Sequence, residues 1–271
     1  MQALSVFQSF VLGALQGLAE FLPISSSAHL ALAPWAFGWP EPGLAFDVAL
    51  HVGSLVALLW YFRAEWIALL RAVLAIVATR RVETVEQRRA VLLIIATIPG
   101  GIAGLLLEKK AETAFRAPAL TAAALIVMGA LLWIVDARAS RSRTLGAFTR
   151  LDAFLTGCAQ AFALIPGVSR SGATITAARA LGFDRESAAT FSFMMSMPII
   201  AAAAVLKVPK ALAESGVTLS LSVAVLTAAV SSLFAISVLL RYVKHRGLGV
   251  FAVYRIVLGA AVLALVAYRA H

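Results

Sequence analysis

Two stretches of the sequence place chemically reactive side chains in apolar surroundings. The first, from Gln16 to His29, has the sequence Gln-Gly-Leu-Ala-Glu-Phe-Leu-Pro-Ile-Ser-Ser-Ser-Ala-His. The second, from Gln160 to Gly172, has the sequence Gln-Ala-Phe-Ala-Leu-Ile-Pro-Gly-Val-Ser-Arg-Ser-Gly. Together they supply a carboxylate, an imidazole, several hydroxyls and a guanidinium. A nucleophile or water, an acid–base group and a positive clamp constitute a hydrolytic set.

The first stretch is broken by Pro23. Gln16 and Glu20 are four residues apart, so they lie on one face of the helix that precedes this proline. A carboxylate inside an apolar region is costly and by default marks a functional site, although Glu20 also fits a cap or an internal salt bridge. We favour the functional interpretation because serines and a histidine follow at once.

Three consecutive serines, Ser25, Ser26 and Ser27, precede a second short helix. Serines are good N-cap residues, and the same geometry aims free backbone N–H groups at an anion. His29 lies one turn further on and is expected to point back towards that anion site. A lone histidine is often a hydrogen-bonded interior residue, but beside Ser26 and Glu20 we expect it to act in catalysis.

The second stretch supplies Ser169, Arg170, Ser171 and Gly172. An arginine stays charged and binds phosphate through two parallel hydrogen bonds. Inside a membrane it needs an anionic partner, and Glu20 is the candidate when no substrate is bound. Glycine allows the backbone to approach an anion closely. Arg170 is therefore the strongest single indication of a phosphate-bearing substrate.

A metal cage of several carboxylates is absent from the sequence. A divalent cation would therefore depend on Glu20 and on the phosphates of the substrate. That arrangement suits Mg²⁺ or Ca²⁺, which take oxygen ligands.

Other polar residues have structural interpretations. Asp47 and His51, at positions i and i+4, form either a second layer around the site or an intrahelical pair. Asp152 is expected to complement the dipole of its helix, and Arg179 to lie as a positive charge at a helix C-terminus.

The composition identifies the class of protein. Of the 271 residues, 62% are hydrophobic and 13% are charged, whereas soluble domains hold about 45–50% apolar and roughly 25% charged residues. The chain is therefore an integral membrane protein. Its net charge of +10 does not indicate nucleic acid, because six of the 23 Lys and Arg lie in 63–89, four in 137–150 and three in 241–246. Basic residues in short loops follow the positive-inside rule.

These patterns predict an all-α polytopic membrane protein with about six full transmembrane helices plus two re-entrant helix–loop–helix segments. A span needs about 20 largely apolar residues. The segments that qualify are 45–62, 88–107, 118–136, 186–206, 217–239 and 250–268. Residues 3–39 and 151–182 are interrupted by prolines, and broken backbone is tolerated in a membrane only where protein or a water-filled cavity surrounds it.

The two re-entrant segments are expected to enter from opposite faces. With all three basic segments on the cytoplasmic side, both termini face the exterior. At a constant offset of 144, Gly13, Gln16, Ser25, Ser27 and Ala28 correspond to Gly157, Gln160, Ser169, Ser171 and Gly172. We therefore predict an inverted-topology repeat, an architecture best known from transporters. Residues 1–271 form a single membrane domain, with repeats 1–136 (re-entrant segment 3–39) and 151–268 (re-entrant segment 151–182).

The two stretches resemble motifs of the undecaprenyl-diphosphate phosphatase family of the bacitracin-resistance type. Gln16 to His29 matches (Glu/Gln)-x-x-x-Glu followed by Phe-Leu-Pro-x-Ser-Ser-(Thr/Ser)-x-His, and Pro166 to Gly172 matches Pro-Gly-x-Ser-Arg-Ser-Gly. Segments at Leu50 and Tyr254 are also similar, so the resemblance covers essentially the whole chain. Many members carry Glu where this chain has Gln, which removes the expectation of proton transfer or a charged metal ligand at position 16.

The resemblance implies hydrolysis of undecaprenyl diphosphate to the monophosphate and inorganic phosphate, which recycles the lipid carrier for peptidoglycan and other envelope polymers. It implies a divalent cation, a place in the bacterial plasma (inner) membrane and a site open to the outer, periplasmic side. The catalytic residues that it implies are Glu20, Ser26, His29 and Arg170, with Glu20 also as metal ligand. The phosphate-binding residues that it implies are Gln16, Ser25, Ser27, Ser169, Ser171 and Gly172.

A transporter or flippase of a lipid phosphate or small anion is the alternative on the same fold. Such a carrier needs the donors of Arg170 but not a carboxylate, a serine and a histidine together, so we favour hydrolysis. The residues leave open whether Ser26, His29 or water attacks phosphorus, and we prefer Ser26 with His29 handling protons. They also leave open a homodimer, the chain length of the lipid and whether the protein flips it.

Overall fold

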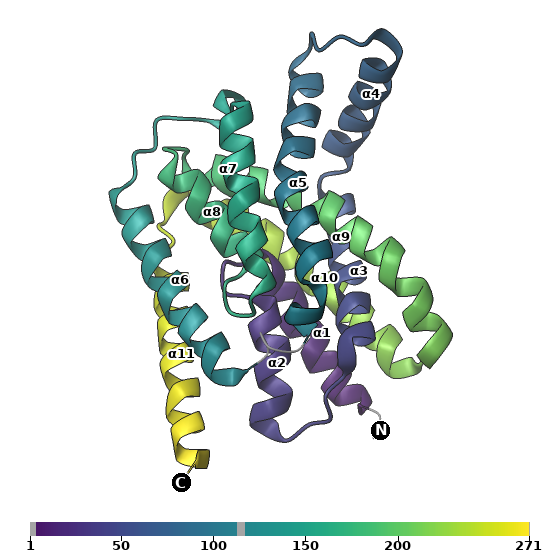
Figure 1. Cartoon of the computed structure of the whole chain (residues 1–271), viewed down its shortest axis with the longest axis vertical. Coiled ribbons are helices and arrows are strands. Elements are labelled where there is room, and N and C mark those ends of the chain that lie inside the picture. Colours follow the sequence, from purple (N-terminus) through teal and green to yellow (C-terminus); the bar gives the residue numbers. More distant parts are fainter. Residues whose placement is uncertain (1–3, 113–116, 271) are drawn as a thin grey trace.

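The computed structural model describes residues 4–112 and 117–270, and the regular structure of these residues is helical (Figure 1). The helices are α1 (Val6–Phe21), α2 (Ser26–Phe37), α3 (Gly43–Tyr61), α4 (Arg63–Thr79), α5 (Val85–Glu112), α6 (Pro118–Arg138), α7 (Arg150–Ala161), α8 (Arg170–Ala180), α9 (Arg185–Ser215), α10 (Leu219–His245) and α11 (Gly249–Ala270), with short 3-10 turns η2 (Leu145–Ala147) and η3 (Phe162–Leu164). The all-α prediction is confirmed.

Five helices are long and apolar enough to cross a membrane. Their candidate spans are Val85–Leu107, Pro118–Arg138, Arg185–Pro209, Leu219–His245 and Gly249–Ala270. The apolar part of α3, Phe46–Tyr61, is shorter and falls within the predicted span 45–62. The polytopic membrane class is thereby confirmed, with five of the six expected spans at full length. Helices suit this role because all their backbone hydrogen bonds are made within the segment.

Two helix breaks occur where the sequence places prolines. Residues 22–25 separate α1 from α2, and residues 165–169 separate η3 from α8. The N-cap of each second helix is a serine in a left-handed conformation, Ser25 with φ 76° and Ser169 with φ 69°. Each serine hydroxyl accepts a hydrogen bond from the N–H three residues later. The expected capping is present in both breaks, in a backbone conformation that residues other than glycine seldom adopt.

The packing of the two broken segments is matched. In α1, Gly13 lies directly against the backbone carbonyl of Ala224 in α10, and in α7, Gly157 lies in the same way against that of Ala96 in α5. A Cβ at either glycine would collide with the carbonyl, so only glycine allows this close approach. The two glycines are 144 positions apart, as are the two capping serines. Equivalent positions in the two halves thus make equivalent contacts.

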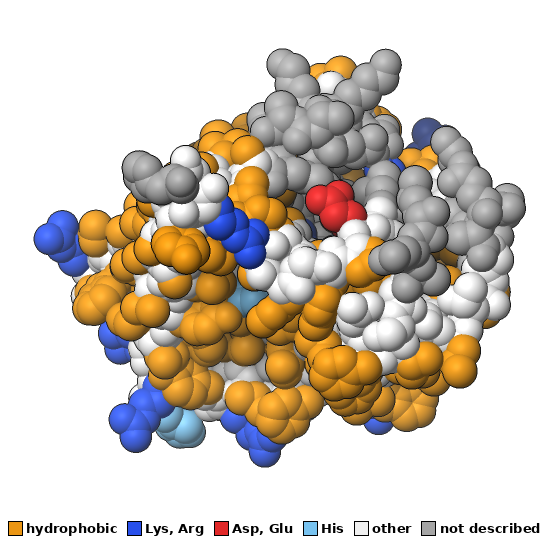
Figure 2. Space-filling model, turned by 90° about the horizontal axis from the view of Figure 1, so that it is seen from below, with side chains coloured by type: hydrophobic (Ala, Val, Ile, Leu, Met, Phe, Trp, Pro, Cys, Tyr) orange, Lys and Arg blue, Asp and Glu red, His pale blue; other side chains and the backbone are white. Residues whose placement is uncertain are grey.

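The ends of the molecule differ in charge. The segments 63–89, 137–150 and 241–246, which hold thirteen of the basic residues, lie towards the end opposite to both chain termini (Figure 1). Among the described side chains seen at the end with the termini, hydrophobic ones predominate, and Lys and Arg lie mostly near the margin (Figure 2). This grouping of the basic segments is the one that the positive-inside rule requires of a single cytoplasmic face.

A buried ion cluster at the basic end joins three helices, α6, α8 and α9, and the turn that precedes α11. Asp136 accepts hydrogen bonds from Arg179 Nε at 3.0 Å, from Arg185 Nε at 2.7 Å and from the backbone N–H of Leu248 at 2.9 Å. Arg179 is fully buried, and its guanidinium also donates to two backbone carbonyls just after the end of α6. This arginine does lie in the last turn of its helix, as expected, but it connects α8 to α6 instead of standing free.

Candidate active site

The Glu20 carboxylate is the point at which the two broken segments meet. Its Oε2 accepts hydrogen bonds from Gln16 Nε2 at 3.1 Å and from Ser26 Oγ at 2.5 Å. Its Oε1 accepts from Arg170 at 2.6 Å, across the interface between α1 and α8. The carboxylate side chain is 4% exposed and the arginine side chain 14% exposed. The predicted pairing of Arg170 with Glu20 is therefore present, and Ser26 is brought onto the same carboxylate.

A histidine from α3 completes this cluster. His51 Nε2 lies 3.5 Å from Glu20 Oε2, and His51 Nδ1 lies 2.7 Å from the backbone carbonyl of Asp47. A carbonyl only accepts hydrogen bonds, so Nδ1 carries the proton and Nε2 faces the carboxylate. Asp47 and His51 were expected to form either a second layer around the site or an intrahelical pair. The contact with Glu20 places His51 in the layer around the site.

The serines hold the two breaks together. Ser25 Oγ accepts a hydrogen bond from the N–H of Gly167 at 3.2 Å, and Ser171 Oγ donates to the carbonyl of Leu22 at 3.2 Å. Within each break the serine hydroxyls are paired, Ser25 with Ser27 at 3.2 Å and Ser169 with Ser171 at 3.3 Å. These residues line the breaks as predicted, and the hydrogen bonds now present are those of caps and loop contacts.

Arg255 is a part of the site that the sequence argument did not single out. Its guanidinium, on α11, is fully buried and donates to the carbonyls of Pro23 at 3.2 Å, Gly167 at 2.7 Å and Val168 at 2.9 Å. It thereby bridges the first break to the second. A Cβ at Gly172 would collide with this guanidinium, which explains the glycine there. The signal was available, since a charged residue within an apolar span is by itself an indication of function.

His29 makes different contacts from those expected. Its Nδ1 lies 2.7 Å from the carbonyl of Ser25, and its Nε2 lies 2.6 Å from the hydroxyl of Tyr254 on α11. The two rings are stacked with centroids 5.7 Å apart. Because the carbonyl must accept, Nδ1 carries the proton and Nε2 accepts from the tyrosine. The hydroxyl of Ser26 is bonded to Glu20 and not to this histidine.

The donor atoms of the site fit a hard divalent cation only in part. Among the described residues, no group of three or more His, Cys, Asp and Glu side chains is placed to hold a metal ion. Glu20 supplies one carboxylate, and the buried Oε1 of Gln16 has no hydrogen-bond partner in the part of the chain that the structure describes. Carboxylate and amide oxygens are ligands of Mg²⁺ and Ca²⁺. The set therefore suits a cation whose remaining ligands come from a bound phosphate or water.

Comparison with known proteins bears on this arrangement. Residues 9–261 match the family model described as bacitracin resistance protein BacA. A protein from Gemmatimonas aurantiaca named undecaprenyl-diphosphatase is 59% identical over 266 residues, which are 98% of this chain and 100% of that protein. Relatives with the same name from Moorella thermoacetica (48% identical) and Pelotomaculum thermopropionicum (47% identical) align over 97% and 98% of this chain and 98% of their own lengths. The chain belongs to the BacA family.

Proposed function

We propose that this protein hydrolyses undecaprenyl diphosphate to undecaprenyl monophosphate and inorganic phosphate. Relatives aligned along almost the whole chain carry the name of that activity. The observation that carries the proposal is the convergence of Ser26 and Arg170 on the buried carboxylate of Glu20. A hydroxyl bonded to a carboxylate and next to a guanidinium combines a nucleophile, a proton acceptor and a charge clamp.

Ser26 is the nucleophile of the proposed reaction. Its Oγ attacks the terminal phosphorus while its proton passes to Glu20, the acceptor of its 2.5 Å hydrogen bond. The bond between that phosphorus and the bridging oxygen breaks, so the lipid leaves as its monophosphate. Water then cleaves the phosphoserine ester and releases inorganic phosphate. Glu20 replaces His29 as the expected proton acceptor because of this contact.

Arg170 and the starts of α2 and α8 stabilise the charge on the phosphoryl oxygens. The guanidinium that now pairs with Glu20 can transfer its hydrogen bonds to the phosphate, which is a bidentate acceptor. Backbone N–H groups in the first turns of both helices favour an anion. Glu20 and Gln16 Oε1 would hold Mg²⁺ or Ca²⁺, which would supply further positive charge to the phosphate. Phosphoryl transfer depends mainly on such positioning and electrostatics.

His29 holds the serines in place within this scheme. Its Nδ1–H binds the carbonyl of Ser25, the residue that precedes the nucleophile, and Tyr254 fixes the ring through Nε2. The imidazole thereby connects the serine-bearing break to α11. In this role it is a positioning residue.

We also propose the inverted repeat, with the termini and the site on the outer side of the bacterial inner membrane. The matched contacts of Gly13 and Gly157 and the common end of the basic segments support it. Cysteines placed at Arg81 and at Tyr268, both highly exposed, test it after Cys158 has been replaced by serine. In intact cells a membrane-impermeant maleimide should label position 268 only. Labelling of both sites would contradict the arrangement.

A transporter or flippase is the second candidate, and the matched halves are the observation that favours it. The carboxylate–serine pair is nevertheless present in the first half only, because Leu164 and Arg170 stand at the positions equivalent to Glu20 and Ser26. A carrier has no use for a serine bonded to a buried carboxylate. The discriminating experiment measures phosphate release from undecaprenyl diphosphate by the purified protein, with and without EDTA. Absence of release in the presence of Mg²⁺ and of Ca²⁺ would overturn the hydrolase.

A further inference from the structure

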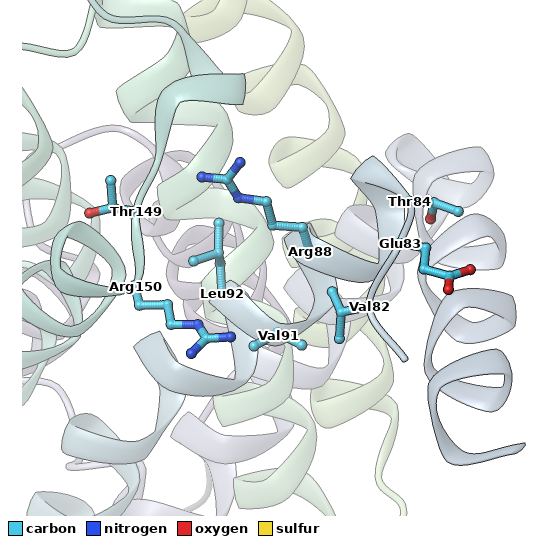
Figure 3. Close-up of a pocket in the computed structure, with 8 residues that line it drawn as sticks. All are labelled: Val82, Glu83, Thr84, Arg88, Val91, Leu92, Thr149 and Arg150. Atoms are coloured by element: carbon cyan, nitrogen blue, oxygen red, sulfur yellow. The ribbon is translucent and has the colours of Figure 1, made fainter. Parts of the chain in front are cut away.

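A cavity lies away from the candidate active site, between the start of α5 and the start of α7. Its volume is about 490 Å³, and its lining includes Val82, Arg88, Leu92 and Arg150 (Figure 3). Of its lining residues, Arg150 is the first residue of α7 and the others lie outside the two broken segments. None of them contacts Glu20, Ser26 or Arg170 through a hydrogen bond or ion pair within the described chain. The proposed hydrolysis leaves this cavity unexplained.

The cavity has positive charge without a matching carboxylate. Arg88 and Arg150 both border the space around Leu92 (Figure 3). Within the described residues neither arginine forms an ion pair, and the one side-chain hydrogen bond of Arg88 is to the carbonyl of Phe148 at 3.3 Å. Glu83 also lines the cavity, but its carboxylate points away from both guanidiniums (Figure 3). Two guanidiniums therefore remain available to an anion.

The neighbouring carboxylates have other partners. Glu83 lies 3.5 Å from Arg81, and Asp152, one turn into α7, is bonded to Arg143 at 2.5 Å and to Thr149. The start of α7 adds its own positive end to the field of the two arginines. A phosphate group suits this combination because guanidinium and phosphate match in geometry as well as in charge.

The position of the cavity along the membrane normal and its apolar wall indicate a lipid phosphate. The candidate span of α5 begins at Val85, so the cavity lies where that helix leaves the apolar part of a membrane, at the level of lipid headgroups. Val82, Val91 and Leu92 give it an apolar wall beside the arginines. It also lies at the basic end of the molecule, which the proposed orientation places on the cytoplasmic side, where the leaflet is anionic. The phosphate of a lipid headgroup would contact the two arginines, and its glycerol would contact this apolar wall.

We propose that this cavity binds the headgroup of an anionic phospholipid, with the phosphodiester between Arg88 and Arg150 and the glycerol on the apolar wall. The bound lipid bridges the loop between α4 and α5 to the start of α7, two segments that are far apart in the sequence. It stabilises the folded protein, since any ligand bound only by the native state raises the unfolding temperature. The site is separate from that for the diphosphate substrate.

The test compares lipid binding by the full-length protein in detergent, using phosphatidylglycerol and phosphatidylcholine in native mass spectrometry and thermal unfolding. Arg150→Gln is the primary variant, because no side-chain hydrogen bond of Arg150 is lost with it in the described structure. Arg88→Gln with Arg150→Gln removes both charges. The matched control is Arg71→Gln with Arg241→Gln, two exposed helical arginines outside the cavity.

We expect wild-type protein and the control pair to retain phosphatidylglycerol and to unfold at a higher temperature in its presence than in phosphatidylcholine. Arg150→Gln should weaken this binding by about tenfold, and the double variant by more. The loss of one hydrogen bond to a charged group is sufficient to raise the dissociation constant by about that factor. Equal weakening in the control pair would assign the effect to general surface charge and overturn the site. Inorganic phosphate that displaces the lipid at similar concentration would show a plain anion site and overturn the lipid assignment.

Discussion

The hydroxyl of Ser26 donates a 2.5 Å hydrogen bond to the carboxylate of Glu20, across the break that separates α1 from α2. The same carboxylate also binds Arg170 from the second broken segment. The proposed nucleophile, its proposed proton acceptor and the proposed phosphate-binding group are thus joined through one buried side chain.

Replacing Ser26 by alanine should reduce phosphate release to background. The hydroxyl would be lost as nucleophile while the carboxylate keeps its bonds to Gln16 and Arg170. Rapid quenching with substrate labelled in the terminal phosphate should trap phosphate on wild type and not on Ser26→Ala. Ser222→Ala is the control, because the hydroxyl of Ser222 is bonded to the carbonyl of Thr218 at the start of α10 and not to Glu20. If Ser26→Ala keeps about a tenth of the turnover, a barrier change of only ~1.4 kcal/mol, Ser26 is not the nucleophile.

Arg170→Lys should lower turnover by about 10²-fold or more, the scale of removing one preorganised donor from a transition state. Lysine keeps the charge and loses the planar fork that matches a phosphate. Steady-state kinetics on the lipid diphosphate measures the effect as a fall in kcat. Arg269→Lys is the control, since Arg269 is exposed and contacts the end of α2, through two carbonyls and the ring of Trp35, and not Glu20. Near-normal kcat in Arg170→Lys would leave a general positive charge as the requirement.

Tyr254→Phe should lower kcat by up to about tenfold, the range expected for the loss of one hydrogen bond. The reason is that His29 would lose the partner of its Nε2 while it keeps the carbonyl of Ser25. In a double-mutant cycle, Tyr254→Phe should add little to His29→Ala, because the tyrosine acts through the histidine. Tyr268→Phe, at an exposed position, is the control. Full additivity of the two losses would show that Tyr254 does not act through His29.

Acid should remove the stabilising contribution of Asp152 at the basic end. Burial by itself would raise the pKa of this carboxyl, but hydrogen bonds from Arg143 and Thr149 and the arginine charge together hold the pKa below its ordinary value. Its contribution to stability is therefore complete above the ordinary pKa of an aspartate and is lost as the pH falls through the lower pKa of the folded state.

Thermal unfolding of wild type and Asp152→Asn between about pH 3 and pH 7 tests this linkage. The wild type should unfold at a higher temperature at neutral pH, and the difference should shrink towards the acid end. Glu65→Gln, at an exposed position of α4, serves as control. A difference that stays constant with pH would show that the ion pair with Arg143 does not contribute through its charge.

The local features of this protein were determined by its sequence. Long apolar runs specified the five full spans, and Pro23 and Pro166 coincided with the two helix breaks. The serines that follow were correctly expected to cap the next helices, and the pairing of Arg170 with Glu20 was anticipated from the need of a buried charge for a partner. Each of these depends on chain-local geometry or on a single strong electrostatic requirement.

Only the tertiary structure decided which polar groups touch. His29 was expected beside Ser26, but the rotation of α2 in the bundle turns the imidazole towards Tyr254 and leaves the serine hydroxyl on Glu20. Arg255, more than two hundred residues from Pro23, bridges the two breaks because α11 packs against α6 next to α8. Sequence spacing specifies the face of a helix that a residue occupies, whereas the rotation and neighbours of that helix follow from close packing along the whole chain.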